Sequence, residues 1–410
     1  MSAYEHETLQ HKTIRTLATA QIGAGIGTAG TVAAGSLLVA SITGSEELAG
    51  LAQTFSVLGA AALALPLARL TSHGGRRTAL SFGYGAGVLG SIFAILGGVN
   101  SNIFLMLMGS FLVGSASASA FQARFAAIDL VPESHRAKQL SYVVWGSTVG
   151  AVTGPNLMQP AGNFAEYFGL PRLVGPYIIS TITLSFASVL IFLMLKPDPY
   201  LTALGEGKSY EAGKKRIKDA LLHILQRPMA LFAILSIAIG HVAMIAVMVM
   251  TPVHMAHVDV SLKIIGLVIS VHVIGMYAFS PVVGSISDRI GKIKTIQVGL
   301  IILLSSTMVA GSAKADDITR LGVGLFLLGL GWSFTLIAGS ALLSSSVDAT
   351  LKTSAQGASD LTMNLVGAIG GATAGVIISS LTYGWLCLFA AVPVVLLSIW
   401  SFTFTSYKTK

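Results

Sequence analysis

The chain has 410 residues, of which 53% are hydrophobic and 10% are charged, with a formal net charge of +8. A soluble domain carries roughly 25% charged residues, so this composition excludes a globule with a polar surface. The apolar runs mostly have the roughly 20 residues that cross a bilayer as a helix, whereas membrane barrels use short alternating strands. The basic residues lie mostly in short loops between these runs, which argues against a nucleic-acid surface. We therefore predict an all-α membrane protein.

Twelve apolar runs follow one another along the chain, and we predict twelve transmembrane helices in two six-helix bundles. The polar stretch 197–227 separates an N-terminal bundle, 1–196, from a C-terminal bundle, 228–410. Apolar residues at helical spacing within 209–225 predict an amphipathic helix on the membrane surface. In chain order the runs cover residues 16–42, 47–70, 78–98, 102–128, 139–163, 173–196, 228–252, 263–286, 295–312, 319–345, 356–381 and 384–406.

Lysine and arginine are distributed unevenly between the two sets of alternating loops. Positively charged residues concentrate in the cytoplasmic loops of membrane proteins. We therefore predict a multi-pass protein of the cytoplasmic (inner) membrane, with both termini and the 197–227 loop in the cytoplasm. In this orientation the basic residues left outside are Arg172, Lys263, Lys314 and Arg320.

Two loops of the sequence resemble each other. Gly75-Arg76-Arg77 lies between the second and third predicted helices, and Asp288-Arg289-Ile290-Gly291-Lys292 lies between the eighth and ninth. The two glycines are 216 positions apart, and Asp129 and Asp348, which end the fourth and tenth helices, are 219 apart. Such a repeat is typical of transporters built from two related halves. We expect Arg76 to reach Asp129 and Lys292 to reach Asp348.

The second of these loops also resembles the loop signature of the major facilitator superfamily of transporters, over the segment Gly284-Ser285-Ile286-Ser287-Asp288-Arg289-Ile290-Gly291-Lys292-Ile293-Lys294. The first loop keeps Gly-Arg-Arg but has Ser72 where the family has aspartate, which predicts a weaker latch in the first half. The resemblance covers the whole chain and implies a secondary transporter with a cytoplasmic gate that works by alternating access. The expected gate residues are Arg76, Arg77, Asp129, Asp288, Arg289, Lys292, Asp348 and Asp360.

The fifth predicted helix carries Gly146, Gly150, Gly154 and Pro155. This run resembles the Gly-Pro signature of proton-coupled exporters in the superfamily, although the family's further glycines are absent after Pro155. Small residues four apart also form a smooth face for close helix packing, which says nothing about the direction of transport. Both interpretations stay open.

Ionisable residues inside the predicted spans are functional candidates because lipid makes them costly. Arg124 lies deeper in the fourth helix than Asp129, and it either binds an anionic group or pairs with a neighbouring acid. Asp360 and Asn364 share a face of the eleventh helix, and Asp360 either belongs to the latch or carries a proton. Gln21 in the first helix is a candidate for the substrate cavity.

Methionine and histidine are concentrated in the seventh and eighth predicted helices. Met244 and Met248 are four apart, as are His272 and Met276, so each pair shares a helix face. Thioether and imidazole together suit Cu(I). The two pairs resemble those of a bacterial copper-importing branch of the superfamily, which has close relatives that carry organic solutes such as flavins. Methionine is also ordinary core filling. The dense segment contains His241, Met244, Met248, Met250, His254, Met255 and His257.

We predict a secondary active transporter of a small solute, with Cu(I) as the most concrete candidate. The alternatives are a proton-coupled exporter, an antiporter, of a drug-like or metabolic organic compound, and a membrane sensor without transport. The sequence has no P-loop, HExxH pair or Gly-x-Ser-x-Gly elbow, so we expect neither enzymatic activity nor a cofactor. We expect a monomer that binds its substrate and lipid but no nucleic acid. The expected substrate contacts are Met244, Met248, His272, Met276, Arg124 and Gln21, the first four of them as metal ligands.

Overall fold

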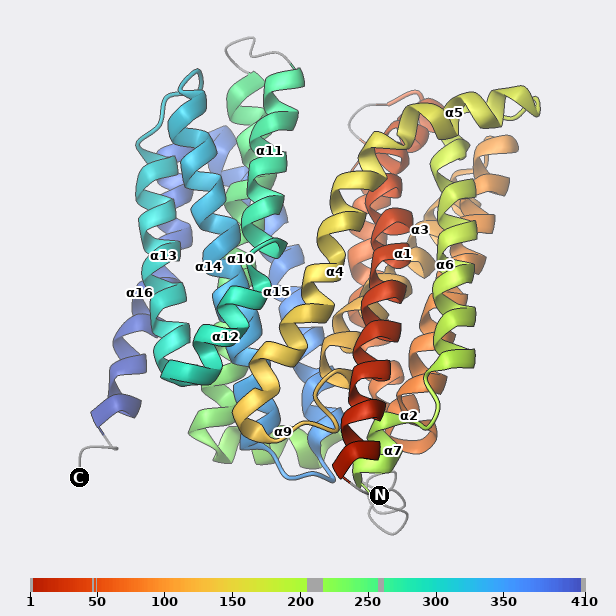
Figure 1. Ribbon diagram of the computed structural model, residues 1–410. Helices are drawn as coiled ribbons and strands as arrows, with labels where there is room; N and C mark the ends of the chain where they lie inside the picture. Colours follow the sequence, from red (N-terminus) through yellow and green to blue (C-terminus); the bar gives the residue numbers. More distant parts are fainter. Residues whose placement is uncertain (1–2, 46–47, 49, 205–216, 257–261, 407–410) are drawn as a thin grey trace. The chain divides into compact units, whose positions relative to one another are not determined.

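A computed structural model describes the chain except residues 1–2, 46–47, 49, 205–216, 257–261 and 407–410 (Figure 1). The described residues form helices and connecting loops, with no β-strand among them. The α-helices are α1 (Ala3–Thr43), α2 (Leu51–Val99), α3 (Ile103–Ala126), α4 (Arg136–Asn156), α5 (Met158–Tyr167), α6 (Gly175–Met194), α7 (Pro199–Leu204), α9 (Ile217–Gln226), α10 (Pro228–Ala256), α11 (Leu262–Tyr277), α12 (Ser280–Ile290), α13 (Lys292–Gly311), α14 (Ile318–Ser346), α15 (Lys352–Ser380) and α16 (Tyr383–Ser406).

Within the described residues, 10 helical segments are long and apolar enough to cross a membrane. One of them is α2, which Gly75 divides into two spans because its φ of 80° lies outside the helical range. The remaining span is α4, a 21-residue helix that falls outside the apolar set because it is rich in polar and small residues. The chain is therefore an all-α membrane protein with twelve transmembrane helices in two six-helix bundles, which confirms the predicted fold class.

Several predicted runs are interrupted in the structure. The run 263–286 is two helices, α11 and α12, because Pro281 in the first turn of α12 has no N–H to continue the preceding helix. The run 139–163 is likewise divided between α4 and α5. The predicted amphipathic helix at 209–225 lies partly outside the described residues, and its described part is α9, with Ile224 buried and Leu225 exposed.

The helices pack into two units. The first contains residues 1–131, 146–221 and 348–364, and the second contains 132–145, 222–347 and 365–410. The predicted division at 197–227 stays a prediction, since these units are not continuous in sequence: the first turns of α4 pack with later helices and the first turns of α15 pack with earlier ones. Both α4 and α15 therefore contribute residues to each unit.

Small residues bring the helices of each unit close together. In the first unit, a Cβ atom on Gly90 of α2 would overlap the backbone at Gly109 of α3, and the reverse also holds. In the second unit, α14 packs against α10, α11 and α13, and its Trp332 is fully buried. Helix association in lipid depends on such close van der Waals packing, because lipid tails remove the hydrophobic drive.

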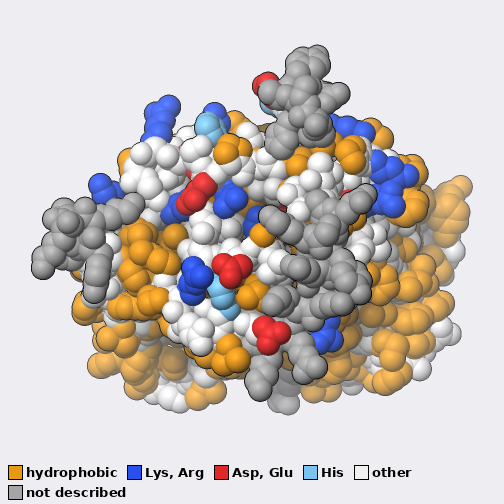
Figure 2. All heavy atoms as spheres, turned by 90° about the horizontal axis from the view of Figure 1, so that it is seen from below, with side chains coloured by type: hydrophobic (Ala, Val, Ile, Leu, Met, Phe, Trp, Pro, Cys, Tyr) orange, Lys and Arg blue, Asp and Glu red, His pale blue; other side chains and the backbone are white. Residues whose placement is uncertain are grey.

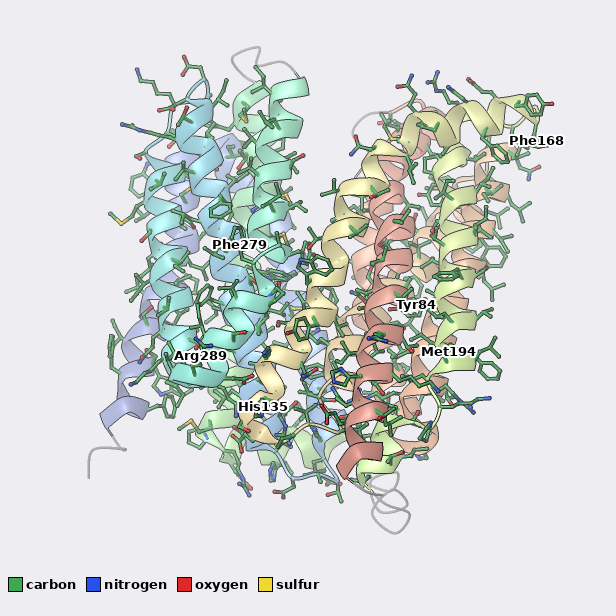
Figure 3. The ribbon with its side chains drawn as sticks, viewed as in Figure 1. Tyr84, His135, Phe168, Met194, Phe279 and Arg289 are labelled. Atoms are coloured by element: carbon green, nitrogen blue, oxygen red, sulfur yellow. The ribbon has the colours of Figure 1, made fainter. Side chains whose placement is uncertain are left out.

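Charged side chains gather at one end of the helices, shown in Figure 2, while hydrophobic side chains cover the flanks. We call this end of each unit its basic end, defined by Arg76 and Lys352 in the first unit and by Arg136 and Lys292 in the second. Figure 3 labels Arg289 at this end. A polar end with apolar flanks is the surface expected of helices surrounded by lipid.

Candidate functional site

A buried ion cluster lies at the basic end of the first unit. Asp129, in the turn after α3, accepts hydrogen bonds from Arg76 Nε at 2.7 Å and from Arg76 Nη2 at 3.3 Å. Lys352 of α15 places its Nζ 3.6 Å from Asp129 Oδ1, and Arg76 Nη2 also donates to Gln356 Oε1 at 2.7 Å. The Arg76 and Asp129 side chains are each 1% exposed. Two cations therefore share one buried carboxylate, and the cluster attaches the first turns of α15 to α2.

The turn that presents Arg76 depends on Gly75 and on a carboxylate that sequence analysis missed. The φ of Gly75, 80°, lies in a region that glycine occupies without a steric cost, and a Cβ there would overlap Asp198. Asp198 Oδ2 accepts from the backbone N–H of Arg77 at 2.7 Å. Its Oδ1 accepts from two N–H groups in the first turn of α7, so Asp198 also caps that helix. Aspartate next to Pro199 at the start of a helix was the available signal.

A second buried ion pair in the first unit joins α3 to α15. Arg124 Nη2 lies 2.6 Å from Asp360 Oδ1, and the two side chains are 2% and 0% exposed. Arg124 Nη1 also donates to the backbone oxygen of Phe121 at 2.6 Å, and the guanidinium lies 4.4 Å from the centre of the Phe125 ring. The other carboxylate oxygen, Asp360 Oδ2, has no hydrogen-bond partner among the described residues.

The basic end of the second unit carries a more exposed cluster. Lys292 Nζ lies 2.5 Å from Glu133 Oε1 and 3.0 Å from Ser345 Oγ, and Arg136 Nη1 donates to the same hydroxyl at 3.1 Å. The hydrogen bond from Lys292 holds the pKa of Glu133 below its usual value. Within its own unit Lys292 contacts Glu133 and Ser345, while Asp348 belongs to the first unit, so the expected pairing of Lys292 with Asp348 stays a prediction.

Asp288 binds the first turn of α4 within the second unit. Its Oδ1 accepts from Ala137 N at 3.1 Å and its Oδ2 from Lys138 N at 2.9 Å, where the helix dipole also favours an anion. The neighbouring Arg289 is exposed. A cavity of about 540 Å³ lies beside this contact, lined by acidic, basic and apolar side chains that include Glu133, Asp288, Lys292, Lys294, Met229 and Phe404.

A constant difference of 216 in residue number relates the two clusters. Arg76 corresponds to Lys292, Asp129 to Ser345, and Arg136 to Lys352. The contacts agree, because Arg76 and Lys352 meet at Asp129 while Lys292 and Arg136 meet at Ser345. The counterpart of Asp129 is therefore Ser345 and not Asp348, as sequence spacing had indicated.

The methionine and histidine pairs lie on two helices of the second unit, α10 and α11. His272 is fully buried, its Nδ1 lies 2.8 Å from Leu325 O of α14, and it packs with Met276 against Gly329 of the same helix. Met244 is also buried, and its helix, α10, packs against α14 and α16 and has few contacts with α11. Among the described residues, no three His, Cys, Asp or Glu side chains gather as metal ligands. His257 lies outside the described residues.

Sequence analysis also missed an aromatic partner for the first histidine of that segment. Trp332 Nε1 of α14 donates to His241 Nδ1 at 3.1 Å, and the ring of Tyr277 packs edge-on against Trp332. A tryptophan in the middle of an apolar run has no distinctive sequence pattern, so only the packing of α10 on α14 reveals this contact.

The expected packing glycines and Gln21 lie where α1 meets α4. A Cβ on Gly150 would overlap Gly25, and Gly146 and Gly154 face α1 in the same way. Gln21 Nε2 donates to Ser147 Oγ at 2.9 Å and its Oε1 accepts from Tyr84 OH at 3.4 Å, so its amide joins α1, α2 and α4. The side chain of Pro155 lies outside the described residues.

The fold and the two loop clusters define a protein of two related six-helix halves. The sequence profile of the Major Facilitator Superfamily matches residues 17–259 and 241–410, and the chain belongs to this superfamily of membrane transporters. It is 35% identical to the MFS-type transporter YdeG of Bacillus subtilis (strain 168), over 98% of this chain and 94% of YdeG.

Two further similarities have lower identity. The riboflavin transporter RfnT of Brucella anthropi is 25% identical over 81% of this chain and 80% of RfnT. The crystal structure of the Escherichia coli fucose:proton symporter FucP matches with a TM-score of 0.71 at 14% identity, covering 95% of this chain and 98% of FucP. The structural match supports the fold alone.

Proposed function

We propose that the chain is a secondary active transporter that carries a small organic solute across the cytoplasmic membrane by alternating access. The observation that carries this proposal is the attachment of the first turns of α15 to helices from the other half of the sequence. Arg76, Asp129, Lys352 and Gln356 make that attachment, and we call these four residues the gate. A charge network that forms in one state and breaks in another biases the equilibrium between the two states.

Three observations favour an organic solute over Cu(I). The His272 imidazole is engaged with Leu325 O of α14, and the helix that carries Met244 and Met248, α10, has few contacts with α11. RfnT, which shares 25% identity with this chain, is named for riboflavin, an organic compound. The buried aromatic and polar side chains of the second unit, such as Trp332 and His241, suit organic chemistry. Cu(I) stays the alternative.

Transport by purified protein in liposomes tests this proposal. Riboflavin and Cu(I) are the first probes, followed by a panel of metabolites and cationic dyes, with each flux measured in both directions. We expect an organic solute to move, and Arg76→Gln to reduce the flux at an equal amount of protein. Arg69→Gln, which changes an exposed arginine of the same helix, should leave the flux unchanged. Transport of Cu(I) alone, or equal fluxes in wild type and Arg76→Gln, would remove the proposal.

We further propose that the basic end faces the cytoplasm, because lysine and arginine concentrate there. The two ends of α13 provide a matched pair of positions, since Lys294 and Lys314 are both exposed. In a Cys387→Ser background, a membrane-impermeant maleimide applied to intact cells should label Lys314→Cys and not Lys294→Cys. The reverse labelling pattern would invert the topology, and labelling of both positions would refute the assignment of α13 as a span.

A further inference from the structure

Asp129 and Asp360 are both buried acids of the first unit, but their surroundings differ. Asp129 is held by two cations, with both carboxylate oxygens engaged. Asp360 has one cation at one oxygen, Oδ1, while its Oδ2 has no hydrogen-bond partner among the described residues. The amide of Asn364, one turn further along α15, donates to the backbone oxygen of Asp360 and not to its carboxylate. The charge of Asp360 therefore depends mainly on Arg124.

We propose that Asp360 is the residue at which this transporter binds and releases a proton, and that Arg124 occupies the carboxylate when the proton is absent. In the protonated state, a proton taken from a hydronium ion binds a carboxylate oxygen of Asp360, and the ion pair with Arg124 breaks. In the deprotonated state, the proton returns to water and the ion pair re-forms. The inference rests on the proposed transport function and adds its coupling ion.

Burial gives the physical reason for this exchange. A carboxylate that is 0% exposed cannot be stabilised by water, so it stays ionised only while a cation lies beside it. When Arg124 moves away, the neutral acid becomes the cheaper form. Proton binding and loss of the α3–α15 contact are therefore linked, and each favours the other.

The neighbouring charges support Asp360 as the switchable acid. Arg124 of α3 is its direct partner, and Arg76 of α2 adds a weaker attraction, partly neutralised by the bond between Arg76 and Asp129. Lys352 lies two turns earlier on α15 and contacts Asp129. Asp129 would keep a cation if either partner left, whereas Asp360 would lose the only cation that contacts it among the described residues.

The repeat between the two halves gives an independent argument. The residues that correspond to Arg124 and Asp360, at the same difference of 216, are Ser340 and Val144. The corresponding positions of the second half therefore carry no charged pair. A buried charge pair that the fold does not need in one half is more readily explained by function than by stability, because such pairs contribute little net stability.

Infrared difference spectroscopy of the purified protein tests the site without a substrate. The C=O stretching band of a protonated carboxylic acid should appear as the pH is lowered, and Asp360→Asn should lose it. In Arg124→Gln the band should persist to a pH about 1–3 units higher than in wild type. The reason is that an adjacent arginine normally lowers the pKa of an aspartate by about this amount. Asn364→Ala, one turn away, should retain the wild-type titration.

Two outcomes would overturn the proposal: a titrating band that survives in Asp360→Asn, or a band in Arg124→Gln that disappears at the wild-type pH. If Asp360→Asn fails to fold because Arg124 is left unpaired, the double variant Arg124→Gln, Asp360→Asn replaces it and should lack the band. This measurement is independent of transport. A titrating Asp360 in a protein that moves no organic solute would refute the proposed function and leave the proton site standing.

Discussion

The basic ends of the two units hold corresponding residues together with different side-chain chemistry. In the first unit, Arg76 and Lys352 meet at a carboxylate, Asp129, that is 1% exposed. In the second unit, the corresponding Lys292 and Arg136 meet at a hydroxyl, Ser345, and the nearby acid Glu133 is 63% exposed. Breaking a buried pair leaves an uncompensated charge, whereas an exposed pair is screened by water. The cluster of the first unit should therefore contribute more electrostatic energy to stability than the corresponding cluster of the second unit.

The largest effect that distinguishes the two units should come from Asp129→Asn. The substitution leaves Arg76 and Lys352 buried without their carboxylate, a loss of about 3–5 kcal/mol for a buried pair. Thermal unfolding in detergent should show a large drop in Tm, whereas Ser345→Ala, the corresponding change in the second unit, should produce a much smaller one. Equal drops for the two variants would show that the clusters are energetically alike.

Close helix crossing gives the next effect, and here the two units should respond alike. A Cβ on Gly357 of α15 would overlap Ala68 of α2, and at the corresponding crossing of the second unit a Cβ on Gly284 of α12 would overlap Ser141 of α4. Gly357→Ala and Gly284→Ala should each cost about 1–3 kcal/mol through overpacking. Gly375→Ala is the matched control in α15, because a Cβ there meets no atom within 4 Å.

Unfolding temperatures of these three glycine variants can be compared directly. Gly375→Ala should leave the Tm unchanged or raise it, since alanine restricts the unfolded chain more than glycine does. A destabilised Gly375→Ala would mean that any substitution in α15 is harmful and would remove the crossing argument. Destabilisation by only one of the two crossing variants would mean that the repeat does not extend to helix packing.

The capping carboxylates should give a smaller difference. Asp288 accepts two backbone N–H groups at the start of α4, so Asp288→Ala should cost about 0.5–2 kcal/mol, the range for a lost helix cap. Asp288→Asn keeps one acceptor and should lie between Asp288→Ala and wild type in Tm. At the corresponding position the first unit has Ser72, whose hydroxyl donates to Arg69 O. Ser72→Ala should therefore have less effect than Asp288→Ala, and the opposite order would contradict the capping role.

The fold was predictable from sequence because hydrophobic length and loop charge act locally. Twelve spans follow from apolar runs, and the Gly75 turn follows from the repeated loop. The pairing of Arg76 with Asp129 was also expected, since both lie in repeated positions. These features can be predicted from local sequence and the thickness of the bilayer, without knowing how distant helices pack.

The partners of the other site residues were not predictable because they depend on packing between distant helices. Arg124 and Asp360 are 236 positions apart, and no periodicity links them. The hydrogen bond from Lys292 to Ser345 of α14 was likewise not predicted, because a serine in a helical run has no distinctive pattern. Asp198 lies in the polar stretch 197–227, where no site residue was predicted, and its bond to the Arg77 backbone had no sequence signal beyond its helix cap.

The smallest effect concerns Lys292 and Glu133, and its pH dependence can separate it from the others. The pKa of Glu133 is lowered in the folded protein, first by the hydrogen bond from Lys292, so its contribution to stability is present above the unfolded pKa. That contribution is lost as the pH falls through the pKa of Glu133 in the folded protein.

Glu133→Gln should therefore lower the Tm slightly at neutral pH, in keeping with about 0.2–1 kcal/mol for an exposed pair. The gap from wild type should close below about pH 4, near the ordinary range of a glutamate. High salt should reduce the gap at neutral pH, because an exposed pair is screened. A gap that persists in acid, or that matches the Asp129→Asn loss, would place the second cluster among the buried pairs and end the contrast between the two units.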